Sequence, residues 1–160
     1  MKIRFICHIF ILAIVSIAAA GLPAQPALAE TCRAVVKELN QLLDPKIDEK
    51  ELVVILRTLN ETGNKKVPPR FVTKSQAKKL GWKPGRDLWR YNKLVGKCIG
   101  GDIFANRERQ LPNGKRVWRE ADLDYKGGPR GAKRIVYSND GLRMVTVDHY
   151  KTFKEVRPCQ

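Results

Sequence analysis

Metal-binding patterns are scarce in this 160-residue sequence. It contains no Cys-x-x-Cys pair, and its only histidines are His8 and His149. Structural zinc sites use four cysteine or histidine ligands, usually in closely spaced pairs. The sequence therefore predicts a protein that holds no metal ion and needs no cofactor.

Long apolar segments are also lacking, apart from one at the start of the chain. Residues 5–20 are mostly apolar, follow the basic residues Lys2 and Arg4, and precede the small-residue stretch 27–29. This order is typical of a secretory signal peptide. A membrane anchor is the alternative, but the run is short for a spanning helix and no second one follows. We expect cleavage after Ala29, export to the extracellular space or periplasm, and no membrane attachment afterwards.

Acidic residues are few compared with basic ones. The chain has 16 acids against 31 lysines and arginines, a formal net charge of +15. Without residues 1–29, which hold two of the basic residues and no acid, 29 basic residues face 16 acids and the net charge is +13. This excess favours a polyanionic ligand: nucleic acid, anionic lipid or acidic polysaccharide. Solubility is the alternative explanation, but it rarely needs more than about eight net charges.

Three cysteines remain after export: Cys32, Cys98 and Cys159. An oxidising compartment makes one disulfide plausible, with one cysteine left over. Spacing does not choose among the three possible pairs.

Helical periodicity dominates the first part of the exported chain. Apolar residues recur at helical spacing in residues 31–43 and again in residues 48–60. Thr73 could cap a third, short helix that ends at Lys79. Residues 83–96 combine proline, glycine and aromatic residues without periodicity, which predicts an ordered loop.

From Lys97 onward, short β-prone runs alternate with Gly, Pro, Asn and Asp. The runs read KCIGGDIFAN, RVWREADLDY, KRIVYSNDG, LRMVTVDHY and FKEV. The sequence Ser-Asn-Asp-Gly at residues 138–141 is a hairpin-turn signal. We therefore predict one α+β domain, with N-terminal helices followed by a twisted antiparallel β-sheet. Its parts are the signal peptide (1–29), a helical extension (30–64) and the main domain (65–160).

The run VWREADLD at residues 117–124 places several acids on one side of a strand. With a period of two, Trp118, Glu120, Asp122 and Asp124 share one face of the strand. A solvated sheet face is the simple interpretation. Under that interpretation none of the three carboxylates has a chemical role.

Glu120 and His149 together offer what general acid–base catalysis needs. One group is ionised near neutral pH, and the other can hold a proton there. A lone histidine is more often structural, so His149 alone is a weak signal. Cations that could surround the pair are Lys74, Arg107, Arg130, Lys133 and Arg134. Guanidinium groups facing Glu120 would lower its pKa, bind phosphate and stabilise the charge of a phosphoryl transition state.

Several motifs, in order, are similar to those of barnase and its relatives, the bacterial guanyl-preferring ribonucleases. They are FVTKSQAKKLGW, IGGDIFANRE, LP followed by WREADLDY, RIVYSNDG and TVDHYKTF, and they span about residues 65–157. The resemblance implies that Glu120 is the general base and His149 the general acid. It implies that Lys74, Arg130 and Arg134 carry the phosphate and transition-state charge.

The resemblance extends to substrate recognition. Phe104, Asn106, Arg107 and Glu108 in FANRE resemble the guanine-reading loop, and Tyr150 would stack on the base or sugar. The family loop usually reads FSNRE, whereas this chain has Ala105. Asp102 resembles a buried acid that orders neighbouring cations, and Asp122 and Asp124 resemble structural residues.

The residues and the family resemblance together predict a secreted, monomeric endoribonuclease that cleaves single-stranded RNA, preferably 3′ to guanosine. The expected products are a 2′,3′-cyclic phosphate and then, after hydrolysis, a 3′-phosphate. The resemblance also implies a small acidic inhibitor protein of the barstar kind as a partner. The alternative is a non-catalytic basic protein of the same fold that binds nucleic acid or an inhibitor.

Overall fold

The computed structural model describes residues 30–160, and the predicted signal peptide lies outside the described residues. The helices are α1 (Cys32–Gln41), α2 (Glu49–Glu61) and α3 (Lys74–Lys79). The strands are β1 (Phe71–Val72), β2 (Cys98–Ile103), β3 (Trp118–Asp122), β4 (Arg134–Ser138), β5 (Arg143–Thr146) and β6 (Lys154–Glu155). Within this part of the chain, no helix is long and apolar enough to span a bilayer.

Each helix begins at a residue whose side chain accepts a hydrogen bond from the first turn. Thr31 accepts from the Ala34 N–H, and Asp48 accepts from the Glu51 N–H. Thr73 forms a reciprocal capping box with Gln76 at the start of α3. These bonds satisfy backbone donors that a helix leaves unpaired. The three predicted helices are therefore confirmed, each to within two residues at either end.

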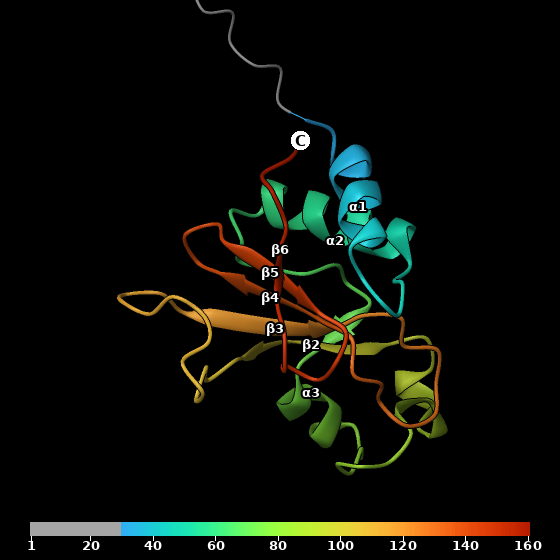
Figure 1. Cartoon of the computed structure of the whole chain (residues 1–160). Helices are drawn as coiled ribbons and strands as arrows, with labels where there is room; N and C mark the ends of the chain where they lie inside the picture. Colours follow the sequence, from blue (N-terminus) through green and yellow to red (C-terminus); the bar gives the residue numbers. More distant parts are fainter. Residues whose placement is uncertain (1–29) are drawn as a thin grey trace, which may run out of the picture.

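The six strands form one sheet in the order β1-β2-β3-β4-β5-β6. Strands β2 to β6 are antiparallel neighbours, which confirms the predicted α+β fold with its antiparallel sheet. Strand β1 pairs parallel to β2 and was not predicted, because two residues are too few to show alternation. Figure 1 shows α1 and α2 together on one side of the sheet, and α3 beyond the opposite edge, next to β2.

The two faces of the sheet have different roles. On one face, Ala121 of β3 packs with Ile135, Tyr137 and Val145 in the main core, which also contains the buried residues of α1 and α2. The other face carries a smaller apolar cluster around Trp118 and Val136, next to the polar residues of β3 and β4. The predicted alternation along β3 is confirmed. The polar face is not solvated, however, because Glu120 and Asp122 are both buried.

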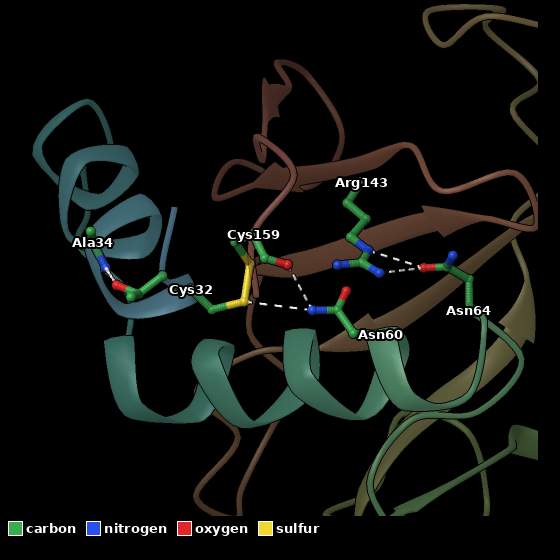
Figure 2. The surroundings of a disulfide bond; sticks show 7 residues. Cys32, Ala34, Asn60, Asn64, Arg143 and Cys159 are labelled. Atoms are coloured by element: carbon green, nitrogen blue, oxygen red, sulfur yellow. Dashed lines mark hydrogen bonds between the residues drawn. A yellow bond between two sulfur atoms is a disulfide. The ribbon is translucent and has the colours of Figure 1, made fainter. Parts of the chain in front are cut away.

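The two ends of the described chain are joined. Cys32, the first residue of α1, forms a disulfide with Cys159, 127 positions later, and Cys98 is left as a buried free thiol. Figure 2 shows Asn60 beside this bond, where its amide donates to the Cys159 carbonyl oxygen at 2.8 Å. The C-terminal segment is thereby fixed to α1 and to the end of α2.

The predicted ordered loop contains two single 3₁₀ turns, Leu88–Arg90 and Asn92–Leu94. The Tyr125 hydroxyl fixes this loop by accepting from the Leu88 N–H and donating to the Asp87 carboxylate, each at 2.9 Å. The loop thus packs against the segment that follows β3.

Candidate active site

Glu120 lies in the middle of β3 and is only 5% exposed. One carboxylate oxygen accepts a hydrogen bond from Lys74 Nζ at 2.6 Å, and the other accepts from the Tyr150 hydroxyl. Lys74 is the first residue of α3, and Tyr150 lies in the turn after β5. Three segments far apart in the sequence therefore meet at this carboxylate.

These contacts set the ionisation of Glu120. Burial would by itself raise the pKa of this carboxyl group, but the hydrogen bonds from Lys74 and Tyr150 outweigh it. The positive charges of Lys74 and Arg134 act in the same direction, so the pKa is lowered from its ordinary value. The predicted direction is confirmed, although the direct donors are an ammonium group and a phenol rather than guanidinium groups. Glu120 is a charged acceptor at neutral pH.

Asp122 anchors the two arginines of the site. Arg130 donates to it from Nε at 2.7 Å and from Nη2 at 2.6 Å, and Arg134 Nε lies 2.9 Å from Asp122 Oδ1. Asp122 is 2% exposed and Arg134 is 3% exposed. The strand register places Asp122 opposite Arg134, on the same face as Glu120. Asp122 is therefore a structural acid, as predicted, and not a solvated one.

Asp124, the third acid of the run, also has partners in the fold. Its carboxylate accepts from the Asp48 N–H at 2.8 Å and from Lys133 Nζ at 2.6 Å. These bonds join the start of α2 to the β3–β4 connection. Lys133 is thus used in the fold and does not line the cleft described below.

His149 lies on an exposed turn with an unusual backbone. His149 and Tyr150 have φ angles of 59° and 69°, in the left-handed region that most residues avoid. Asp148 holds this turn, because it accepts from the N–H groups of Lys151 and Thr152 and from the Thr152 hydroxyl. Burial alone would raise the pKa of Asp148, but these hydrogen bonds lower it to about 2. Asp148 was not predicted from the sequence, although an aspartate three and four residues before its backbone donors is a recognisable turn pattern.

Asp102 supports Lys74 in a different way from the one expected. It is partly exposed, not buried, and its Oδ2 accepts from the Lys74 backbone N–H at 2.9 Å. It therefore fixes the first turn of α3 and positions Lys74 through the main chain. The buried acid that orders cations is Asp122.

The residues of the predicted guanine-reading loop are of two kinds. The Asn106 side chain is buried and fully used within the loop: it donates to Leu111 O and Asn113 Oδ1, and accepts from the Leu111 N–H. Arg107 and Glu108 are exposed, and their side chains make no hydrogen bond to residues 30–160. Asn106 thus shapes the loop, while its two neighbours are available to a ligand.

Phe104 and Tyr150 form the aromatic wall of the site. Their rings stack with centroids 5.1 Å apart and planes 30° apart. Burial raises the pKa of the Tyr150 phenol, and its hydrogen bond to Glu120 raises it further. Tyr150 therefore stays a proton donor to Glu120, a contact that the sequence analysis did not foresee.

Eleven residues were given a catalytic, substrate-binding or supporting role from the sequence, and ten of them line one cleft of about 440 Å³. These ten are Lys74, Phe104, Asn106, Arg107, Glu108, Glu120, Arg130, Arg134, His149 and Tyr150. Asp102, the eleventh, is behind Lys74. A second hollow of about 390 Å³ shares Lys74, Arg130, Arg134 and His149 with the cleft and continues it toward Lys78 and Arg86. The combined surface is an open, cationic groove with one buried carboxylate at its centre.

Comparison with known proteins identifies the family of this chain. A model of the ribonuclease family matches residues 57–157. The chain belongs to the ribonuclease family. Its members are RNA-cleaving enzymes, and the predicted resemblance is confirmed at the level of the family. The match begins within α2 and leaves α1 outside.

Relatives of this ribonuclease are found among bacteria. Over 94 residues, or 58% of this chain, it is 48% identical to a ribonuclease of Heyndrickxia coagulans, of which it covers 85%. It is also 48% identical over 94 residues to ribonucleases of Bacillus intermedius and Bacillus pumilus. The aligned part spans 57% of the length of each of these two proteins.

In the described part of the chain, no three His, Cys, Asp or Glu side chains are grouped as metal ligands would be.

Proposed function

We propose that this member of the ribonuclease family is a secreted endoribonuclease that cleaves single-stranded RNA, preferably 3′ to guanosine, without a metal ion. The observation that carries the proposal is one cleft that holds Glu120, His149 and the cations Lys74, Arg130 and Arg134. A buried carboxylate with a lowered pKa is a base that stays ionised, and an exposed histidine can exchange protons with a substrate. A protein that only bound RNA would not need either group.

In the first step, Glu120 accepts the proton of the ribose 2′-hydroxyl. The 2′-oxygen then forms a bond to phosphorus in line with the bond from phosphorus to O5′, which breaks. His149 donates its proton to O5′, so the leaving strand departs with a 5′-hydroxyl group. The products are a 2′,3′-cyclic phosphate and the downstream strand. The proton that the 2′-hydroxyl gives to Glu120 is balanced by the proton that His149 gives to O5′.

In the second step, the two groups exchange roles. Neutral His149 accepts a proton from water, whose oxygen bonds to phosphorus. The bond from phosphorus to the 2′-oxygen breaks, and protonated Glu120 returns its proton to that oxygen. The product is a 3′-phosphate, and both side chains regain their starting protonation.

The cations stabilise the charge that builds up on the phosphoryl oxygens. Lys74, Arg130 and Arg134 together carry three positive charges, against the two negative charges of Glu120 and Asp122. Protonated His149 adds a fourth, so two net positive charges face the phosphate in the first step. Because the arginines are held by a buried carboxylate, little reorganisation is needed as the transition state forms.

The second hollow suggests the direction of the RNA chain. Glu120 and the loop with Arg107 and Glu108 line only the first cleft, whereas His149 lines both. His149 protonates the oxygen of the leaving strand in this mechanism. The downstream strand would therefore extend from His149 into the second hollow.

Export and an inhibitor are further parts of the proposal. The Cys32–Cys159 disulfide supports export, because such bonds persist in oxidising compartments. The exposed cations of the cleft suit a small acidic inhibitor protein, which would protect the producing cell by covering them. We propose a monomer, since the whole cleft is built from one chain.

The first prediction tests the proposed reaction. Wild-type protein in excess EDTA is expected to cleave single-stranded RNA, with a 2′,3′-cyclic phosphate appearing first and a 3′-phosphate later. Phosphorus NMR of a short oligonucleotide substrate measures both species. Binding without cleavage would favour a non-catalytic RNA-binding protein, and cleavage abolished by EDTA would contradict the metal-free mechanism.

The second prediction concerns the base 5′ to the cleaved bond. In the proposed complex, Glu108 accepts hydrogen bonds from the edge of guanine and Arg107 donates to it. Changing Glu108 to glutamine is expected to reduce kcat/KM for GpU. The reduction should correspond to a loss of about 1–3 kcal/mol of transition-state stabilisation, by analogy with other base contacts made by two hydrogen bonds. Initial rates on GpU and ApU provide the measurement, and the ApU rate is the internal control. Equal wild-type rates on both dinucleotides would remove the guanine preference.

A further inference from the structure

Arg143, the first residue of β5, is a buried cation that the proposed reaction does not use. It is only 6% exposed, and it lies on the opposite face of the sheet from Glu120 and Asp122, because it alternates with Met144 of the cluster next to the active site. Its Nε and Nη2 both donate to Asn64 Oδ1, at 3.0 and 2.7 Å. Among residues 30–160, no carboxylate pairs with it, whereas Arg130 and Arg134 both pair with Asp122.

A buried charge without a counter-charge is unfavourable. The amide oxygen of Asn64 is neutral, and burial lowers the pKa of the Arg143 guanidinium with no opposing effect from a nearby acid. Arginine nevertheless stays protonated in proteins, so it cannot relieve the burial by losing its charge. The missing negative charge has to come from outside the described chain or remain uncompensated.

A hollow opens beside this guanidinium. It has a volume of about 360 Å³ and is lined by Arg143, Asn60, Leu142, Val156, Pro158 and Cys159, with Asp140 and Gly141 also present. Figure 2 shows the guanidinium between Asn64 on one side and the Cys159–Asn60 pair on the other. Of the five N–H bonds of the Arg143 side chain, two point to Asn64 and three are left, including both on Nη1.

The one acid in the hollow is already engaged. Asp140 accepts from the Ser138 hydroxyl and pairs with Arg116 at 2.7 Å. Its charge is therefore balanced by another arginine. The free edge of Arg143 is a pair of parallel donors, the arrangement that binds two oxygens of one oxyanion.

We propose that this hollow is a binding site for a phosphate-like oxyanion, with Arg143 as its charged ligand. The site is separate from the catalytic cleft and goes beyond RNA cleavage. A bound oxyanion would supply the missing counter-charge and would join β5 to the disulfide-linked C-terminal segment. The ligand is either a free phosphate ion or a phosphate of a nucleic acid, and the chemistry is the same for both.

The test is thermal unfolding with phosphate replacing chloride at equal ionic strength. The catalytic cleft also attracts phosphate, so the informative quantity is the difference between wild type and Arg143→Met, both of which keep that cleft. Phosphate is expected to raise the Tm of the wild type by about 5 °C more than that of Arg143→Met. The control Arg157→Met removes an exposed cation from the C-terminal segment that borders the hollow. It should keep the full wild-type increase. Equal increases in wild type and Arg143→Met would overturn the proposal.

Two further measurements complete the design. If Arg143→Met does not fold, the wild type is titrated with phosphate instead, and the NMR signal of Arg143 Nε–H is followed. A signal that does not move would overturn the site.

A DNA oligonucleotide of twelve thymidines, which cannot be cleaved because it lacks 2′-hydroxyls, distinguishes the source of the phosphate. Weaker oligonucleotide binding by Arg143→Met identifies a nucleic-acid phosphate as the ligand, and unchanged binding identifies the free ion. RNA cleavage by Arg143→Met should equal that of the wild type, so failure of this proposal and failure of the proposed reaction are separate results.

Discussion

Replacing Glu120 with glutamine, or His149 with alanine, is expected to lower kcat for RNA cleavage by about 10²–10⁴-fold. Glutamine has nearly the shape of glutamate and can still accept a hydrogen bond from Lys74, but it cannot take a proton from the 2′-hydroxyl. Alanine at position 149 removes the proton donor for the leaving oxygen. Single-turnover cleavage of an oligonucleotide with one guanosine measures the chemical step in each variant.

The pH dependence of the same reaction assigns the two roles. Because its pKa is lowered, Glu120 loses its activity as a base only when the pH falls below the ordinary range for glutamate. The acidic limb of the wild-type profile of kcat/KM should therefore lie at low pH, and the alkaline limb should depend on the general acid, the role that the proposed mechanism gives to His149. Each variant should lose the limb of the group that it lacks.

Stability provides an independent check on Glu120. A carboxyl group with a lowered pKa stabilises the folded state when the pH is above its pKa in the unfolded chain. That contribution is lost as the pH falls through the lowered pKa of the folded state. The difference in free energy of unfolding between wild type and Glu120→Gln should therefore shrink on acidification. Glu155→Gln, on the exposed strand β6, is the matched control. It should cleave RNA like the wild type, and its free energy of unfolding should differ little from that of the wild type at any pH. Full activity in either active-site variant would contradict the mechanism.

The helices and most of the sheet could be predicted because their sequence signals are local. Thr31 and Asp48 precede apolar residues at helical spacing, and Thr31, Asp48 and Thr73 all accept hydrogen bonds at a helix start, as capping residues do. The alternation of Ala121 with Glu120 and Asp122 gave the two faces of β3 correctly. The resemblance to a known family then indicated which polar residues of that face belong together.

Other features depend on contacts between distant residues, which leave no local pattern. The choice of Cys32 and Cys159 as the disulfide pair follows from the chain ends meeting, and spacing alone left three pairs open. Strand β1 exists because Phe71 is brought next to Cys98. The close approach there also explains a glycine, since a Cβ on Gly100 would lie 2.6 Å from the Phe71 ring and 2.7 Å from the Ala121 Cβ. The roles of Asn106 and Asp102 likewise depend on partners that only the folded chain supplies.

Changing Asp122 to asparagine is expected to lower the free energy of unfolding by about 3–5 kcal/mol, because it leaves two guanidinium groups without their buried counter-charge. Asparagine can accept a hydrogen bond from one of these arginines, but its amide N–H₂ group would face the donors of the other. Asp122 is 2% exposed, so water cannot readily replace the carboxylate. Urea unfolding followed by tryptophan fluorescence measures the loss. Asp124→Asn, two residues along the same run, is the control and should lose less, since the Asp124 side chain is 18% exposed against 2% for that of Asp122.

The same variant tests whether Asp122 acts on catalysis through the arginines. Arg130 and Arg134 touch the phosphate in the proposed mechanism only if Asp122 holds them in the cleft, which makes Asp122 a positioning residue. At a temperature where Asp122→Asn is fully folded, kcat should therefore fall further than that of the Asp124→Asn control, while the limbs of the pH profile, which belong to Glu120 and His149, should both remain. A folded Asp122→Asn variant with wild-type kcat would show that the arginines keep their places without this carboxylate. A decrease of less than about 1 kcal/mol in the free energy of unfolding would show that the charges of the arginines are compensated elsewhere.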